Sequence, residues 1–90
     1  MKQVHLIISG RVQGVGYRSW FVREARKLKL TGWVFNRPDG TVAVVCVGPE
    51  PVLQEVIQVA KNGPWMAAVD QVDVLWSEVT ETNPDFTVKK

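Results

Sequence analysis

The 90-residue sequence has one cysteine and one histidine, which limits the chemistry that its side chains can support. Cys46 cannot form an internal disulfide, and its neighbours Val45 and Val47 favour a buried strand position over a nucleophile. His5 has no carboxylate or thiol at a suggestive spacing, so we expect it to be structural or surface-exposed. The sequence therefore argues against catalysis by a Ser/His/Asp or a Cys/His set.

Signals for metal sites and membrane segments are equally scarce. No cluster has the ligand spacing of a zinc site. Asp70 and Asp73 lie an odd number of residues apart on an expected strand, so their side chains point to opposite faces. No apolar run approaches the ~20 residues that span a bilayer, and residues 1–11 alternate in a way typical of a strand and not of a signal peptide. We therefore expect a cytoplasmic protein with no metal, no cofactor and no membrane partner.

Length and charge indicate one domain with a positively charged half. We assign residues 1–90 to a single domain and expect it to be a monomer. Residues 1–40 have eight basic and two acidic side chains, a charge of +6, whereas residues 41–90 have three basic and seven acidic ones, a charge of −4. The positive half would attract anionic substrates, although basic side chains are also what a solvated helix face contains.

Hydrophobic periodicity and turn residues predict five strands and two helices. The second helix is expected to run from Pro51 to the stop signal Gly63-Pro64. This order is typical of the α+β ferredoxin-like fold, β-α-β-β-α-β with a terminal strand, in which an antiparallel sheet has two helices on one face. The strands are expected at residues 3–9, 33–35, 41–47, 69–79 and 86–88, the first helix at 19–29, turns at 37–40 and 82–85, and the inner face of the second helix at Leu53, Val56, Ile57 and Ala60.

Three glycines precede the first expected helix, in the run GRVQGVGYR from Gly10 to Arg18. Glycine lets the main chain adopt angles closed to other residues and lets a ligand approach closely. A turn into a helix also presents unpaired N–H groups, and Arg18 adds a planar, positively charged set of donors. The run lacks the P-loop pattern GxxxxGK[ST] and the dinucleotide pattern GxGxxG. It favours a cradle for a phosphate-sized anion, with a structural turn and a surface arginine as the alternative.

Two motifs resemble the signatures of the acylphosphatase family. The run from Gly10 to Arg18 resembles the family loop G-x-V-Q-G-V-x-[aromatic]-R. The run from Gly32 to Gly40, GWVFNRPDG, resembles the second signature, G-W-V-x-N-x-x-D-G. Both occur in the family's order and at about its spacing, and weaker similarity extends to Phe86. The resemblance implies the same ferredoxin-like fold and an enzyme that hydrolyses the carboxyl-phosphate bond of acyl phosphates, giving a carboxylate and inorganic phosphate.

The resemblance also implies roles for individual residues. Arg18 would bind the phosphate oxygens, and the neighbouring backbone N–H groups would complete the cradle, with Gln13 and Val15 acting through backbone geometry. Asn36 would orient the attacking water, because an amide offers both a donor and an acceptor. The alternative is that Asn36 only shapes the turn beside Pro38. The expected phosphate-binding set is Gln13, Gly14, Val15, Gly16, Tyr17 and Arg18, and the expected catalytic pair is Arg18 and Asn36.

Two positions depart from the family pattern. Phe35 stands where family members often have a basic residue, and Gly16 stands where some have a large aromatic one. Neither change removes a residue that the mechanism needs, but both bear on rate and substrate preference. The alternative to an enzyme is a non-catalytic module that binds phosphate or an acyl phosphate.

The four tryptophans suggest a comparison with RNA-binding sheets, which the strand sequences do not support. RRM-type sheets stack bases on aromatic residues of their central strands. Residues 41–47 contain no aromatic residue, and the RNP1 pattern is missing. Trp33 belongs to the second motif, and Trp20, Trp65 and Trp76 are expected to pack in the core or at its rim. We expect a small acyl phosphate as the substrate and no nucleic-acid partner.

Overall fold

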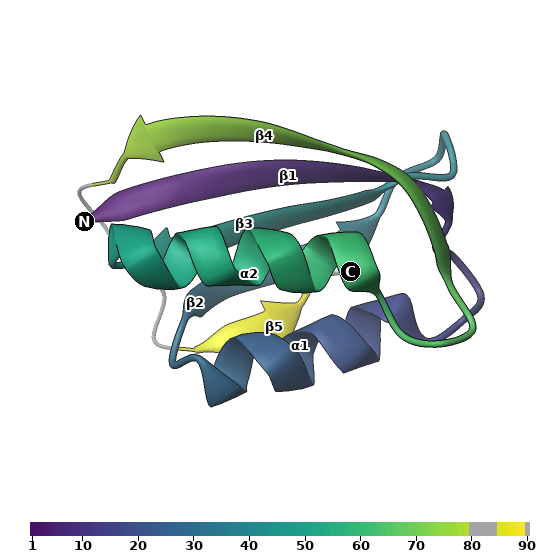
Figure 1. The fold of residues 1–90 in the computed structure, drawn as a ribbon, viewed down its shortest axis with the longest axis horizontal. Coiled ribbons are helices and arrows are strands. Elements are labelled where there is room, and N and C mark those ends of the chain that lie inside the picture. Colours follow the sequence, from purple (N-terminus) through teal and green to yellow (C-terminus); the bar gives the residue numbers. More distant parts are fainter. Residues whose placement is uncertain (80–84, 90) are drawn as a thin grey trace.

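A computed structural model of the chain describes residues 1–79 and 85–89. Its elements follow the predicted order (Figure 1). Of the turn predicted at 82–85, all but Asp85 lies outside the described residues. None of the helices within the described ranges is long and apolar enough to cross a membrane. In chain order the elements are β1 (Lys2–Arg11), α1 (Tyr17–Lys27), β2 (Thr31–Asn36), β3 (Val42–Gly48), α2 (Glu50–Asn62), β4 (Ala68–Glu78) and β5 (Phe86–Val88).

The helix α1 begins and ends two residues before the predicted bounds of 19–29. Gly16, with a φ of 78°, is its N-cap, so Tyr17 already belongs to the first turn. Leu28 ends the helix, and the next residue, Lys29, has a left-handed φ of 59°. Periodicity identifies the residues that face the core, but left-handed backbone angles at the two flanks determine where the helix stops.

The five strands form one sheet in the order β4-β1-β3-β2-β5. The predicted ferredoxin-like fold is confirmed, with one difference: β5 pairs with β2 in parallel, so the sheet is mixed and not wholly antiparallel. β4 ends at Glu78, opposite Lys2, and β5 begins at Phe86, opposite Gly32, at the same end of the sheet. β5 therefore runs in the same direction as β2, and opposite to β4.

Both helices cover the same face of the sheet, and the core lies between them and the strands (Figure 1). β1 alternates as predicted, with every second side chain buried beneath the helices. α2 buries the four predicted residues, and Cys46 of β3 is a buried free thiol, also as predicted. The fully buried side chains include Val4, Leu6, Ile8, Phe21, Ala25, Leu53, Val56 and Ala60.

The tryptophan predictions are confirmed only in part. Trp20 packs against the core, and Trp76 on β4 is 36% exposed. Trp65 is 91% exposed, so its assignment to the core or the rim was wrong. Trp65 lies in the connection between α2 and β4, where neither a helical face nor a strand alternation directs its side chain inward.

Candidate active site

One end of the sheet brings together segments that are distant in the sequence. Ile8 of β1 and Asn36 of β2 lie opposite the same residue of β3, Val42. The loop that follows β1 and leads into α1 therefore lies beside the carboxyl end of β2. The two motifs of the sequence meet at this end of the molecule.

The loop owes its shape to two glycines in the left-handed region. Gly14 has a φ of 75° and Gly16 a φ of 78°, angles that residues with a side chain adopt at a cost. A Cβ built at either position would meet nothing within 4 Å, so backbone angle and not lack of space is the reason for glycine here. The surface above both residues is left open to a ligand.

The loop presents a series of N–H groups that the described part of the chain does not use. In the described part of the chain, no backbone hydrogen bond is donated by the N–H of Gln13, Gly14, Val15 or Gly16. The next three N–H groups belong to the first turn of α1, where intrahelical acceptors are lacking, and the first helical bond runs from the N–H of Trp20 to the carbonyl of Gly16. No acidic side chain lies in that turn. The loop is therefore a set of donors at the positive end of a helix.

The side chain of Gln13 connects this loop to the turn between β2 and β3. Its Nε2 donates hydrogen bonds of 2.9 Å to the carbonyl oxygens of Arg37 and Thr41. The sequence predicts a role for Gln13 through backbone geometry and does not indicate this side-chain contact. No local pattern reports it, because the partners lie 24 and 28 residues further along the chain.

Asn36, the last residue of β2, has the one buried side-chain oxygen or nitrogen that lacks a hydrogen-bond partner among the described residues, its Oδ1. The neighbouring turn is held without it: the N–H of Arg37 donates to the carbonyl of Thr41, and that of Gly40 to the carbonyl of Arg37. The Asp39 carboxylate accepts hydrogen bonds from the hydroxyl and then from the backbone N–H of Thr41, which lowers the pKa of Asp39. The alternative in which Asn36 only shapes the turn therefore finds no hydrogen bond to support it.

Arg18, in the first turn of α1, faces the same space as Asn36. Both line a cavity of about 340 Å³, together with Val12, Gly14, Gly16, Tyr17, Ser19 and Val88. Among the ion pairs between described residues, none includes Arg18. Its charge is thus available beside the loop N–H groups and the unpartnered amide oxygen.

Tyr17 and Val15 have structural side chains beside this cavity. The hydroxyl of Tyr17 is buried and donates a hydrogen bond of 2.7 Å to the carbonyl of Ala60 on α2. Burial, and to a lesser extent the nearby Cys46, raises the pKa of Tyr17, so the hydroxyl keeps its proton and donates. Val15 packs against the core. Both side chains anchor the loop, which leaves only their backbone N–H groups for a ligand.

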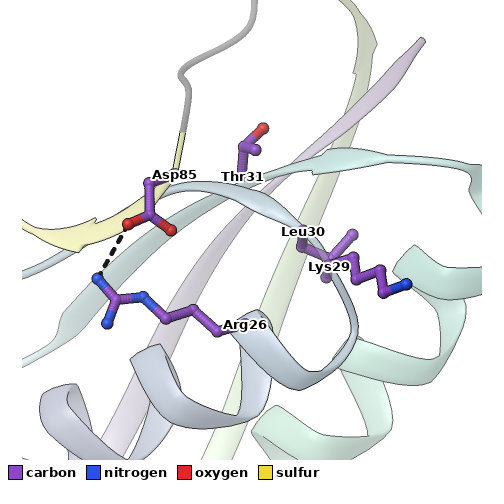
Figure 2. A pocket seen from close by; sticks show the side chains of 5 residues that line it. All are labelled: Arg26, Lys29, Leu30, Thr31 and Asp85. Atoms are coloured by element: carbon purple, nitrogen blue, oxygen red, sulfur yellow. Dashed lines mark hydrogen bonds and ion pairs between the residues drawn. The ribbon is translucent and has the colours of Figure 1, made fainter.

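A separate cavity of about 460 Å³ lies at the other end of α1 (Figure 2). Arg26 reaches across it: its Nη2 pairs with Asp85 at 3.2 Å and its Nε donates to the carbonyl of Phe86 at 3.1 Å. Lys29 points away from this pair in Figure 2. These contacts attach α1 to the start of β5. The charged side chains of this cavity therefore have a structural role, which Arg18 in the cavity of the loop does not show among the described ion pairs.

Gln13→Ala tests the connection between the loop and the turn. We expect the free energy of unfolding to fall by about 1–2 kcal/mol, because two hydrogen bonds to backbone carbonyls are lost. We also expect weaker binding of inorganic phosphate, because the loop N–H groups are less firmly oriented. Denaturant unfolding and a phosphate titration measure the two effects.

The control for this variant is Gln71→Ala. The Nε2 of Gln71 bonds only the exposed carboxylate of Asp73 on β4. We expect its removal to change the free energy of unfolding by less than about 0.5 kcal/mol. Equal effects of the two variants would contradict the role of Gln13 as a connection.

Comparisons with known proteins point to one family. A family model described as Acylphosphatase matches residues 4–88. A protein named Acylphosphatase from Salinibacter ruber is 43% identical over 99% of this chain and 94% of its own length. One from Thermococcus kodakarensis is 51% identical over 87% of this chain and 88% of its own. The crystal structure of acylphosphatase from Bacillus subtilis superimposes with a TM-score of 0.97 over 100% of both chains, at 41% sequence identity.

Proposed function

We propose that Arg18, Asn36 and the loop of residues 13–17 carry out the reaction of the acylphosphatase family, to which the chain belongs. This reaction is the hydrolysis of acyl phosphates to a carboxylate and inorganic phosphate. Arg18 and the loop bind the phosphate, and Asn36 orients the attacking water. Two observations carry this proposal: Asn36 and Arg18 line the same cavity, and the buried Oδ1 of Asn36 has no hydrogen-bond partner among the described residues. Buried polar atoms without a partner are rare and call for an explanation, and a role in orienting the attacking water supplies one.

The phosphate occupies the cavity between the loop and the end of β2. The Arg18 guanidinium donates two parallel hydrogen bonds to two phosphate oxygens, a geometry that a planar fork permits. The N–H groups of residues 13–17 and the positive end of α1 donate to the remaining charge. Donors oriented in advance at the charge of a transition state are worth about 3–4 kcal/mol each, by analogy with oxyanion holes.

Asn36 positions the water for attack on phosphorus. Its Oδ1 accepts one hydrogen of the water, which directs an oxygen lone pair at phosphorus, opposite the acyl oxygen. A bond forms between the water oxygen and phosphorus while the bond between phosphorus and the acyl oxygen breaks. The acyl oxygen leaves with the electron pair as a carboxylate. Since an amide is not a base, the water proton passes to a phosphate oxygen.

The leaving group explains why so few residues suffice. A carboxylate is a weak base and departs without a proton, so the reaction needs no general acid. Phosphoryl transfer then depends on placing the water in line and on neutralising the phosphoryl charge. Two side chains and a loop of backbone donors provide both.

Hydrolysis of benzoyl phosphate in oxygen-18-labelled water, with EDTA present, tests this account. We expect the label in the inorganic phosphate and not in the benzoate, because the water attacks phosphorus. We expect EDTA to leave the rate unchanged, since the described residues contain no group of three or more His, Cys, Asp or Glu side chains placed to bind a metal ion. Mass spectrometry of the products and a rate assay provide the two readouts.

Three results would contradict the proposal. Label in the benzoate would place the attack at the carbonyl carbon, where Asn36 has no role. Activity that disappears with EDTA would require a metal that the proposed residues do not explain. Phosphate binding without turnover would favour the non-catalytic module.

The same family membership supports further proposals on partners and compartment. We propose a monomer of one domain, residues 1–90, because Arg18, Asn36 and the glycines of the loop already line one cavity, and the proposed reaction needs no residue from a second copy. We propose that it has no nucleic-acid partner, because β3, at the centre of the sheet, contains no aromatic residue. The free thiol of Cys46 is ordinary in a reducing compartment, which supports the cytoplasm.

A further inference from the structure

A second cavity, of about 580 Å³, adjoins the candidate active site. Arg18, Phe35, Asn36 and Lys89 line it. Arg18 and Asn36 also line the cavity of the loop, so the two cavities meet at the place where we put the phosphate and the water. Phe35 and Lys89 line only the second one. The volumes of the two cavities lie in the range that small-ligand sites have in proteins, about 300–1,000 Å³.

The sheet explains why these two side chains share a face. Along β2, Val34 is fully buried beneath the helices, so Trp33 and Phe35 project from the opposite face of the sheet. β5 runs beside β2 in parallel, and the N–H of Lys89 donates to the carbonyl of Val34 at 2.9 Å. The Nζ of Lys89 lies 5.0 Å from the centre of the Trp33 ring and 6.0 Å from that of Phe35. A cation is thus held over an aromatic wall.

The arrangement separates two kinds of positive charge. Arg18 belongs to both cavities and serves the phosphate, whereas Lys89 is absent from the cavity that contains Gly14 and Gly16. Its ammonium therefore lies beside the part of the substrate that extends away from the phosphate. That part is the acyl group, whose carbon skeleton extends away from the phosphorus.

We propose that Phe35 and Lys89 form an acyl-group subsite that favours acyl phosphates with a second negative charge on the acyl group. This inference rests on the proposed function, because it takes the phosphate to lie between the loop and Arg18. The Phe35 ring contacts the carbon skeleton of the acyl group, and Lys89 pairs with its distal anion. The substrate class is then the monoacyl phosphates of dicarboxylic acids, in preference to acyl phosphates with an uncharged tail.

A matched pair of substrates tests the subsite: benzoyl phosphate and terephthaloyl monophosphate, which differ by one distal carboxylate. We expect the wild type to favour the charged substrate by about threefold in kcat/KM at low ionic strength, the size of an exposed ion pair. We expect Lys89→Gln to bring this ratio to about one and Lys89→Glu to invert it. High salt should bring the wild-type ratio towards one as well, because it screens exposed charges.

The control is Lys29→Asn, which removes the same charge from the far end of α1 and β2. Asparagine tolerates the left-handed φ of 59° at this position, and we expect the ratio of the wild type. A ratio that Lys89→Gln leaves unchanged, or that Lys29→Asn lowers equally, would overturn the proposal. In the first case Lys89 does not interact with the acyl group. In the second case the preference for the charged substrate reflects the overall charge of the protein.

Product binding separates this proposal from the proposed function. If the wild type hydrolyses neither substrate, the roles of Arg18 and Asn36 fail, and the subsite is judged by titrating benzoate and terephthalate into the wild type and Lys89→Gln. Tighter binding of terephthalate that disappears in Lys89→Gln would support the subsite. Equal binding of the two products by the wild type would overturn it.

Discussion

Arg18→Ala is expected to lower kcat/KM for benzoyl phosphate by about 10³-fold or more, the size of effect seen when an arginine that stabilises phosphoryl charge is removed. Among the described residues that line the cavity of the loop, Arg18 is the one with a positively charged side chain. Alanine leaves the loop N–H groups in place but removes the bidentate donor, so both binding of the phosphate and stabilisation of the developing charge are lost. Steady-state kinetics measure the effect, and a titration with inorganic phosphate should show weaker binding in parallel.

Two further variants define what Arg18 contributes. Arg18→Lys keeps the charge but not the planar fork, and we expect it to recover only part of the activity. Arg23→Ala removes the same charge from an exposed position on α1, five residues further along the helix, and we expect less than about a twofold change because exposed charges are screened. A loss below tenfold in Arg18→Ala, or an equal loss in Arg23→Ala, would show that Arg18 acts only as general surface charge.

Asn36→Ala is expected to lower kcat by about 10²–10³-fold, the effect of removing one oriented polar group from a transition state. KM should change little, because the phosphate is held by Arg18 and the loop and not by Asn36. The free energy of unfolding should stay the same or rise, because no described residue bonds the buried Oδ1 of Asn36 and its removal therefore breaks no hydrogen bond within the described protein. Kinetics and denaturant unfolding of the same preparations test both halves of this prediction.

The stability measurement decides between the two interpretations of Asn36. If Asn36 shaped the turn, its removal would lower the free energy of unfolding and leave kcat of the folded fraction intact. A gain in stability with a loss of kcat is instead typical of residues kept for function. Asn62→Ala, at the exposed end of α2, is the control, and we expect it to leave kcat unchanged.

Local patterns in the sequence determined the elements and their inner faces. The alternation of Val4, Leu6 and Ile8 predicted a strand that is buried on one side, and it is. The spacing of the apolar residues in α2 predicted the face that packs on the sheet. These predictions succeed because the repeat of a helix or a strand determines which nearby residues share one face. The hydrophobic effect then buries the face that is apolar. The glycine loop was also visible, because a left-handed backbone angle selects its residue type locally.

Long-range packing decided the rest, because contacts between distant residues leave no periodic trace in the sequence. The register of β1 and β2 against Val42 brings Asn36 beside the loop, and only there does its Oδ1 become a buried atom in need of a partner. The hydrogen bonds of Gln13 to the β2–β3 turn, and the parallel pairing that sets Lys89 over Trp33 and Phe35, arise in the same way. The sequence alone thus determined which groups this protein has for binding an anion, and the tertiary structure decided which of them face one another.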